Sequence, residues 1–566
     1  MLPGVTFPGG EALAAGSQAI RQVAGNAGIR RIEIAWAIGI AADWAYLVAL
    51  LIAAYAAGGA FGVALLGLLR MIPPAIIAPF ADVPARRFRG DRALLAVNLV
   101  RAVAATATAV VLVSGGPTAL AYLLAGVGAS AGALVRPIQS ALMPALARSP
   151  SELIGANVTT SIGEGAGGFV GPLVGGAIAV AAGPAAGCAV AAAAFVIAGL
   201  AVVGIRFADE VAARGGSLRT SESGVGGLAV TRALRALRSD PEIGLLFTDL
   251  GGQVFVRGML TTLIVVASNE LLGLGDSGVG PLTAAIGFGG FVGAVGALGL
   301  TRITRLATTA LVALAFWGLP IAVTGAWPLV PVALGSMVVV GVSNAILDVC
   351  AFTIIQQGIP TKDRMAVFGL LEGVVGFGVA IGGVAGSVAV EVFGPQGALG
   401  IAGAILPIMA MATWPWVSRI DSRKLASERE AAILRTIPLF APLPLTAIDR
   451  LAGAIRPVAY GPGDVLMRQG ERGETYVAIT SGSVDIATDG RHVATVGPGD
   501  GIGEIALIRD VPRTATAVAT TEVTGYELSC VDFLSAMAGP ASASAARATI
   551  EARLARSEAR GDPAGA

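Results

Sequence analysis

Long apolar stretches alternate with short polar connections over the first three quarters of the chain. Each stretch reaches about 17–25 residues, enough for a helix to cross the hydrocarbon core of a bilayer. There are twelve, near residues 32–56, 60–81, 93–113, 118–145, 153–180, 184–205, 243–270, 279–301, 306–325, 328–355, 366–390 and 397–418. The pattern predicts an α-helical membrane protein with twelve transmembrane helices.

The connections between the stretches differ in charge. The connections after the even-numbered stretches are basic, for example Arg86 and Arg87 after the second and Arg302 and Arg305 after the eighth. Those after the odd-numbered stretches, such as the one around Gly58, lack lysine and arginine. Basic connections are typical of the cytoplasmic side of a membrane. Because the number of spans is even, both termini are predicted to be cytoplasmic, in a multi-pass protein of the plasma (inner) membrane.

The apolar stretches end near residue 420, and an internal repeat divides them into two sets of six. The segment EGAGGFVGPLVGG begins at Glu164 and EGVVGFGVAIGG begins at Glu372, at corresponding places in the two halves. A repeat of this kind is typical of secondary transporters. The expected parts are an N-terminal lead-in (1–29), helices one to six (30–206), a loop with a basic amphipathic helix (207–242), helices seven to twelve (243–420), a charged connector (421–435) and a soluble domain (436–560).

Two segments of the membrane part resemble motifs of the major facilitator superfamily. The segment from Ala78 to Arg87 is similar to the superfamily's loop motif at Asp82, Arg86 and Arg87, and the glycines around Gly171-Pro172 are similar to its glycine-proline motif. The resemblance implies that these five residues serve as a conformational latch between the two six-helix halves. Helices one to four look like the branch that holds multidrug, macrolide and siderophore exporters.

Several ionisable residues lie inside the predicted spans, where a charge costs several kcal/mol unless it is paired or wetted. The transport or coupling candidates are Asp43, Arg70, Arg136, Glu164, Asp249, Arg257 and Glu372, and Arg101 and Asp348 are further intramembrane charges. Asp43 and Arg70 lie at similar depths and can meet near the midplane, either as a structural pair or as a functional one. Only a carboxylate can carry a proton, so Asp43, Glu164, Asp249 and Glu372 are the carrier candidates. Glu164 and Glu372 can instead be gates at helix ends.

Short alternating segments separated by glycine turns characterise the soluble domain. They predict strands near residues 465–467, 475–480, 483–486, 492–496, 515–519 and 525–528. Their regular spacing is typical of an antiparallel β-roll. Flanking helices are expected near 444–456 and 531–560.

A glycine-rich turn, an acid and an arginine follow one another between Gly499 and Thr514. The turn can point backbone amides at a phosphate, the arginine adds a forked charged contact, and the acid can accept from a ribose hydroxyl. These residues predict a pocket for a sugar phosphate. The segment closely resembles the phosphate-binding cassette of cyclic nucleotide-binding domains.

That resemblance implies a role for each cassette residue. Glu504 would hold the ribose 2′-hydroxyl and Arg513 the cyclic phosphate. Amides of Gly503, Ile505 and Ala506 would hold other phosphate oxygens, and Thr514 would lie near the phosphate and the purine. Thr514 admits cGMP, whereas a bacterial setting, suggested by two lysines among 38 basic residues, favours cAMP. The alternative is a β-roll that has lost its ligand.

Composition narrows the function classes. Hydrophobic residues make up 55% of the 566 and charged residues 13%, with a net charge of +1, which disfavours an ordinary soluble protein and a nucleic-acid binder. One histidine and three dispersed cysteines give no metal centre or resident cofactor, and the chain lacks a P-loop. An enzyme is therefore the least favoured class.

The sequence predicts a secondary active transporter, with proton-coupled efflux of a small amphipathic compound, regulated by the cyclic nucleotide. Its partners would be membrane lipids, the proton and an unidentified small-molecule substrate, and the oligomeric state stays open. Two alternatives are a lipid or lysophospholipid translocator on the same scaffold and a non-transporting membrane receptor for the cyclic nucleotide.

Overall fold

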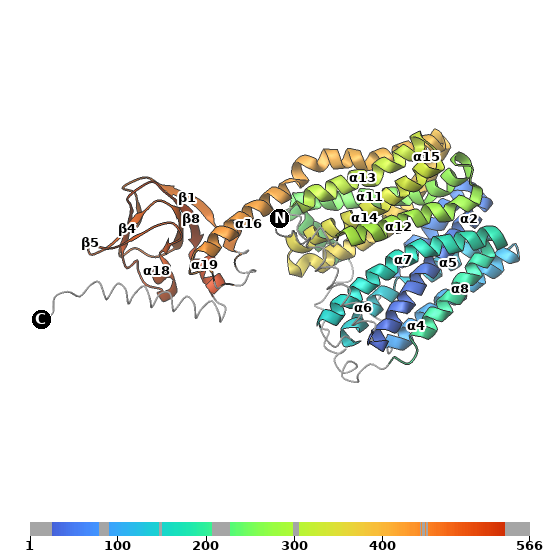
Figure 1. The fold of residues 1–566 in the computed structure, drawn as a ribbon, viewed down its shortest axis with the longest axis horizontal. Helices are drawn as coiled ribbons and strands as arrows, with labels where there is room; N and C mark the ends of the chain where they lie inside the picture. The colour runs from blue at the N-terminus through green and yellow to red at the C-terminus, as the bar shows by residue number, and fades with distance from the viewer. Residues whose placement is uncertain are drawn as a thin grey trace, which may run out of the picture. The chain divides into compact units, whose positions relative to one another are not determined.

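The computed structural model describes residues 25–77, 90–146, 150–205, 227–297, 305–441, 443, 448 and 451–537. The chain divides into two units, Met1–Arg419 and Ile420–Ala566. The described part of the first unit is helical, and the second contains a β-roll with short helices (Figure 1). Each unit is described by itself below.

The first half of the membrane unit begins with a long helix that is bent. Helix α2 (Ala27–Ile77) loses helical geometry at Gly58 and Gly59, and Gly59 has φ of 56°, so one continuous element covers the first two predicted spans. The helices that follow are α4 (Gly90–Val113), α5 (Thr118–Gly132), α6 (Val135–Leu146), α7 (Pro150–Ala182) and α8 (Pro184–Ala201). The predicted fourth span is thus divided between α5 and α6.

The part of the membrane unit from residue 227 onward also contains a bent helix, which is its last one. Its elements are α10 (Gly227–Ser239), α11 (Pro241–Val266), η2 (Ala267–Leu271), η3 (Gly275–Gly278), α12 (Val279–Ala297), α13 (Leu306–Ala326), α14 (Val330–Gly358) and α15 (Thr361–Val417). Helix α15 breaks at Gly394, which has φ of 71°. In the part of the chain that the structure describes, nine helices are long and apolar enough to cross a membrane.

Local sequence explains where α11 begins. Asp240 precedes the helix, and its carboxylate accepts hydrogen bonds from the backbone amides of Glu242 and Ile243 at 3.2 and 3.3 Å. Pro241 occupies the first helical position, where its missing N–H costs nothing. An aspartate-proline pair therefore sets the end of the loop between the two halves.

Helix α10 is the basic helix predicted within 207–242, and residues 207–226 of that segment lie outside the described residues. Its arginines Arg232, Arg235 and Arg238 are exposed. The buried face is formed by Ala233, Ala236 and Leu237 and packs against α15 and α11. The apolar side of the helix thus contacts the membrane unit itself.

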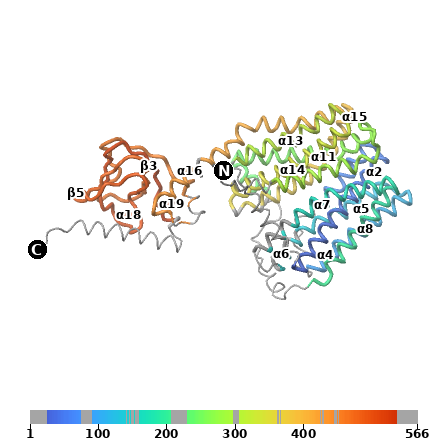
Figure 2. The backbone as a smooth tube through the Cα atoms, viewed as in Figure 1, coloured from blue at the N-terminus to red at the C-terminus, as the bar shows by residue number. Residues whose placement is uncertain are grey.

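Two close helix contacts join the halves. Helix α7 packs against α12, and α2 packs against α15 (Figures 1 and 2). At Gly287 of α12, a β-carbon would overlap the backbone of Gly168 in α7, so a larger residue could not be placed there without moving a helix. Phe169 and Phe288 pack beside this contact, with ring centroids 5.6 Å apart. Small residues thus allow the close approach of α7 and α12.

The β-roll consists of two antiparallel four-stranded sheets. Their strand orders are β1-β8-β3-β6 and β2-β7-β4-β5. The strands are β1 (Arg456–Tyr460), β2 (Val465–Met467), β3 (Thr475–Ser481), β4 (Val484–Thr488), β5 (Arg491–Val496), β6 (Gly501–Ile502), β7 (Thr516–Ala519) and β8 (Val523–Ser529). The antiparallel prediction is confirmed, and β1 and β6 are additional strands.

Among the described residues of the second unit, three helices accompany the roll. They are α16 (Arg419–Thr436), α18 (Glu504–Arg509) and α19 (Cys530–Met537). The helix predicted for 444–456 ends too late, because Arg456 already pairs with Glu527 in the sheet. Beyond Met537, the predicted helix 531–560 lies outside the described residues. Leu434 of α16 shares a buried cluster with Phe440, Tyr476 and Phe533, so α16 packs onto the roll.

Candidate functional site

The predicted phosphate cassette forms a sharp turn between β6 and α18. Gly503 is the residue before the helix and adopts the left-handed conformation with φ of 98°. A β-carbon at this position would collide with the guanidinium of Arg513. Glycine is therefore required twice here, for the backbone angle and for the space that the arginine occupies.

Arg513 is the central side chain of the cassette. It is buried, and its Nη1 donates to the Gly503 carbonyl at 3.0 Å while Nη2 donates to the Thr475 carbonyl at 2.6 Å. Its own backbone amide donates to the Glu471 carbonyl at 2.7 Å. One arginine thus connects the turn, strand β3 and the segment before β3.

Glu504 is the acid of the pair and opens α18. It is buried, with 4% of its surface exposed. Burial lowers the pKa of Arg513, and the negative charge of Glu504 opposes that shift, so the two groups are close enough to influence each other. Gly473 borders the same space, since a β-carbon there would lie 2.8 Å from Ala506 Cβ and 3.5 Å from Arg513 Cζ.

The other cassette residues differ in exposure. Ala506 is buried, Ile505 is half-buried and Thr514 is exposed. The Thr514 carbonyl accepts from the Thr488 hydroxyl at 3.5 Å. The six predicted residues therefore lie in one turn-helix-loop segment, with a buried acid and a buried base beside a glycine turn. Sequence reasoning missed Thr475, because its contact with Arg513 joins residues 38 apart.

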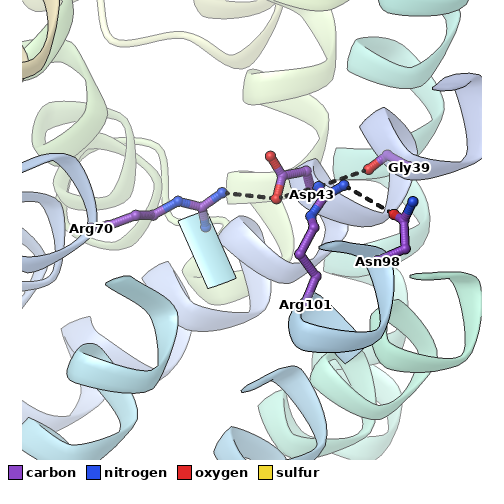
Figure 3. Close-up of polar contacts among 5 residues, drawn as sticks. All are labelled: Gly39, Asp43, Arg70, Asn98 and Arg101. Atoms are coloured by element: carbon purple, nitrogen blue, oxygen red, sulfur yellow. Dashed lines mark hydrogen bonds and ion pairs between the residues drawn. The ribbon is translucent and has the colours of Figure 1, made fainter. Parts of the chain in front are cut away.

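In the membrane unit, Asp43 meets two arginines rather than one (Figure 3). Its Oδ1 lies 3.4 Å from Arg70 Nη2, as the depth argument allows, and 3.0 Å from Arg101 Nη2. Arg101 also donates to the Gly39 carbonyl at 3.3 Å and to Asn98 Oδ1 at 3.4 Å. The sequence pointed to Arg101 as an intramembrane charge without placing it beside Asp43.

Glu164 has a partner in the neighbouring predicted span. Its Oε1 lies 3.4 Å from Arg136 Nη1, and the arginine side chain is 70% exposed. Glu33, which sequence reasoning did not select, is buried and accepts from the Thr160 hydroxyl at 2.8 Å. Glu164 and Glu33 are therefore two further carboxylates in the first half, on α7 and α2.

The second half holds a more deeply buried acid. Asp249 is fully buried, its Oδ2 accepts from the Thr413 hydroxyl at 2.9 Å, and its Oδ1 has no hydrogen-bond partner among the described residues. Arg257 and Glu372 are exposed. The structure thus brings Asp43 and Arg70 together and pairs Arg136 with Glu164, while Asp249 lies apart on α11.

A polar cluster among α11, α13 and α14 joins Asp348, which the sequence singled out as an intramembrane charge, to uncharged polar residues that sequence reasoning missed. Asn344 Oδ1 accepts from Gln253 at 3.0 Å and from the Trp317 indole at 3.1 Å, while its Nδ2 donates to Asp348 at 2.8 Å. The positive charge of Arg257 also acts on Asp348. A run of uncharged polar residues at wide spacing carries no signal in a single sequence.

The predicted latch is only partly described. Asp82, Arg86 and Arg87 lie outside the described residues. Gly171 of α7 faces Ala41 and Trp44 of α2, and the carbonyl of Pro172 would lie 2.7 Å from a β-carbon placed on Gly280 of α12. The glycine-proline motif therefore packs against a helix from each half.

Sequence relatives match the soluble unit. The acetyltransferase Pat of Mycolicibacterium smegmatis is 41% identical over 104 residues, 18% of this chain and 31% of the relative. A cyclic nucleotide-gated potassium channel of Rhizobium etli is 38% identical over 105 residues, 19% of this chain and 29% of the channel. The cAMP-dependent protein kinase regulatory subunit of Debaryomyces hansenii is 36% identical over 109 residues, 19% of this chain and 24% of the subunit. The chain thus spans less than a third of each relative.

Two family models match the two units. The model of the Major Facilitator Superfamily matches residues 34–363, which is more than half of the chain. The model of the cyclic nucleotide-binding domain matches residues 457–539, which include the whole cassette from Gly503 to Thr514. With the helical unit and the β-roll, these matches show that the chain belongs to the Major Facilitator Superfamily and carries a C-terminal cyclic nucleotide-binding domain.

Proposed function

We propose that this protein is a secondary active transporter that exports a small amphipathic compound in exchange for protons and is regulated by a cyclic nucleotide. One observation carries the proposal: the helical transporter unit is continuous with a β-roll in which both Glu504 and Arg513 are present and buried. The protein is proposed to be a transporter and not an enzyme.

The proposed transporter crosses the plasma membrane twelve times, with both termini in the cytoplasm. Counting the bent helices α2 and α15 as two spans each, and α5 with α6 as one, gives twelve. The contacts α7–α12 and α2–α15 then join two six-helix halves, a plan suited to alternating access. In this scheme the halves rock about those contacts, with Gly171 and Pro172 at the pivot.

Asp249 is the proposed proton carrier of the second half. A carboxylate with no exposed surface and one hydrogen bond is costly to keep charged, so loss of its proton should accompany wetting of α11. Asp43 is less suited to this role, because two arginines hold its charge. Exchange of a proton at Asp249 for substrate would couple export to the proton gradient.

The proposed regulatory ligand is cAMP, with cGMP as the second candidate. The relatives of the soluble unit include a protein named as a cAMP-dependent kinase regulatory subunit and one named as a cyclic nucleotide-gated channel. A ligand can bias transport only by binding one conformation more tightly than another. Helix α16 is the proposed link, because it begins at the end of the membrane unit and its Leu434 is packed into the roll.

Proton flux in proteoliposomes tests the transport proposal. A panel of amphipathic drugs added to vesicles with an imposed pH gradient should dissipate that gradient when the chain is present. The Asp249→Asn variant should lose this flux, and Glu391→Gln, an exposed acid on α15, should keep it. Transport by the Asp249→Asn variant at the wild-type rate and with the same dependence on the gradient would remove Asp249 as carrier.

A further inference from the structure

The cluster around Asp43 has more positive than negative charge. One carboxylate faces two guanidinium groups, so an excess of one positive charge is present even when Asp43 is ionised (Figure 3). Arg70 and Arg101 are 5% and 4% exposed, so solvent cannot supply the missing counter-charge. A buried pair would be balanced by one arginine alone.

Hydrogen-bond donors around the cluster are also in excess. Six buried donor atoms have no partner among the described residues, and four of them belong to this cluster: Trp36 Nε1, Arg70 Nε, Arg70 Nη1 and Arg101 Nε. Leaving a buried donor unpaired is expensive, and more so when it is charged. The cluster around Asp43 therefore lacks a negatively charged group that accepts several hydrogen bonds.

A cavity lies beside Trp36 and Arg101, whereas Arg70 contacts Asp43 at its edge. It measures about 60 Å³ and is lined by Trp36, Asp43 and Arg101 together with Asn98 and apolar residues of α2 and α4, among them Ile32 and Leu94. Pockets for whole drug-sized ligands measure about 300–1,000 Å³, so this one suits the end of a molecule. Its lining combines charged and apolar residues, which suits an acid group with an apolar neighbour.

Each arginine of the cluster also contacts an aromatic ring. The Arg101 guanidinium carbon lies 4.0 Å from the centre of the Phe195 ring, and that of Arg70 lies 5.9 Å from the centre of the Tyr46 ring. Glu33 is the other acid on this helix. It lies ten residues away, about 15 Å along the axis, and bonds Thr160. Asp43 is thus the acid in direct contact with both arginines.

We propose that this cavity binds the acid group of an organic anion, a carboxylate or a phosphate monoester, through Arg101 and Trp36. The proposal rests on the proposed transport function and specifies its substrate class: an amphipathic acid. Asp43 competes with the ligand for Arg101, and it keeps Arg70 as its partner when the ligand's acid group binds Arg101. A bidentate acid group on an arginine is among the stronger polar contacts in proteins.

Two small molecules of the same shape test the anion requirement without any variant. Propionate and propionamide differ in charge but hardly in size, and ligand-observed NMR on the purified full chain in detergent can measure weak binding of each. Propionate should bind at least about tenfold more tightly, the effect expected of a charged hydrogen bond. Equal affinity for the two would overturn the proposal. Inorganic phosphate is tested in the same way. If it binds more tightly than propionate, the proposal that the ligand is an organic anion is wrong.

Variants give predictions of opposite sign. Arg101→Gln should remove the preference for propionate, whereas Asp43→Asn, which removes the competing acid, should tighten propionate binding about tenfold. Arg92→Gln is the matched control, because Arg92 lies on α4 as Arg101 does but is exposed. Weaker propionate binding by folded Asp43→Asn protein would contradict the competition. Propionate binding is measured without a proton gradient. A failure of the binding proposal can therefore be distinguished from a failure of the proposed transport function.

Discussion

At the scale of single residues, Arg513 performs two tasks that can be separated. It donates to the Gly503 and Thr475 carbonyls, and it is the buried arginine of the cassette. In the Arg513→Gln variant of the full chain, cAMP affinity should fall about 10- to 100-fold, because a charged hydrogen bond to a phosphate contributes about 1.5–3 kcal/mol. Isothermal titration calorimetry measures the change.

The matched control is Arg509→Gln, since Arg509 is an exposed arginine at the end of α18. It should bind cAMP as the wild type does. Calorimetric unfolding shows whether Arg513→Gln protein keeps the folded roll. A folded Arg513→Gln variant with wild-type affinity would refute the assignment of Arg513 to the phosphate.

Residue-level prediction from sequence worked where a motif is continuous and stopped where contacts are tertiary. Gly503, Glu504 and Arg513 lie within eleven consecutive residues, so their spacing alone indicated a pocket. Asp43 and Arg70 could be matched because both are counted from one turn. Arg101 lies on α4, and nothing in one sequence says which face of α4 meets α2.

At the scale of elements, a hydrogen bond joins the two halves of the membrane unit. The Tyr55 hydroxyl of α2 donates to Glu270 Oε1 of η2 at 2.6 Å. The proposed topology places this contact at the outer ends of the helices. The Tyr55→Phe variant should therefore favour opening of that side, by about fivefold in population, as expected for about 1 kcal/mol.

Distances between spin labels measure that opening. Labels introduced by Ser114→Cys and Leu329→Cys, in a chain with Cys530→Ser, lie in one outer connection of each half. Tyr122→Phe is the control, because Tyr122 is on α5 beside Gly62 of α2, within one half. An unchanged distance distribution in Tyr55→Phe would show that the hydrogen bond does not restrain the halves.

Helix α16 supplies a second prediction at this scale. Leu434 has no exposed surface and lies in the cluster of Phe440, Tyr476 and Phe533. The Leu434→Ala variant should lower the free energy of unfolding of the second unit by about 2–5 kcal/mol, the usual cost of such a core truncation. Differential scanning calorimetry detects this as a lower transition temperature.

The neighbouring Arg435 is exposed, so Arg435→Ala should leave that transition in place. If Leu434→Ala also leaves it unchanged, α16 is not packed on the roll in solution. A Leu434→Ala protein that stays folded should bind cAMP but transmit less of its effect, because α16 is the proposed link to the membrane unit.

The sequence predicted strand boundaries where alternating residues are bounded by glycine turns. Six strands were located from alternation between glycine turns, but β6 has two residues and contains a glycine, which leaves no alternation to detect. Strand β1 carries Pro457, and the helix predicted for 444–456 overlaps only its first residue, Arg456. As an edge strand paired only with β8, it tolerates the missing N–H.

At the scale of the whole molecule, the composition break near residue 420 was enough to separate two units, because membrane and water select different residues. The division of the structure falls between Arg419 and Ile420. The cassette and the intramembrane charges can each be interpreted from neighbouring residues. One sequence does not show how strongly ligand binding in one unit affects the conformation of the other. Regulation is a coupling free energy between them, and typical couplings change an affinity or a population 5- to 150-fold.

The most direct test of regulated transport compares transport rates with and without cAMP. Proteoliposomes of the full chain are assayed under one proton gradient, with a substrate from the proton-flux screen and cAMP at a concentration that saturates binding. The wild type should change its rate at least about fivefold. The Arg513→Gln variant should keep its basal rate and lose the response. An identical wild-type rate with and without bound cAMP would contradict the account.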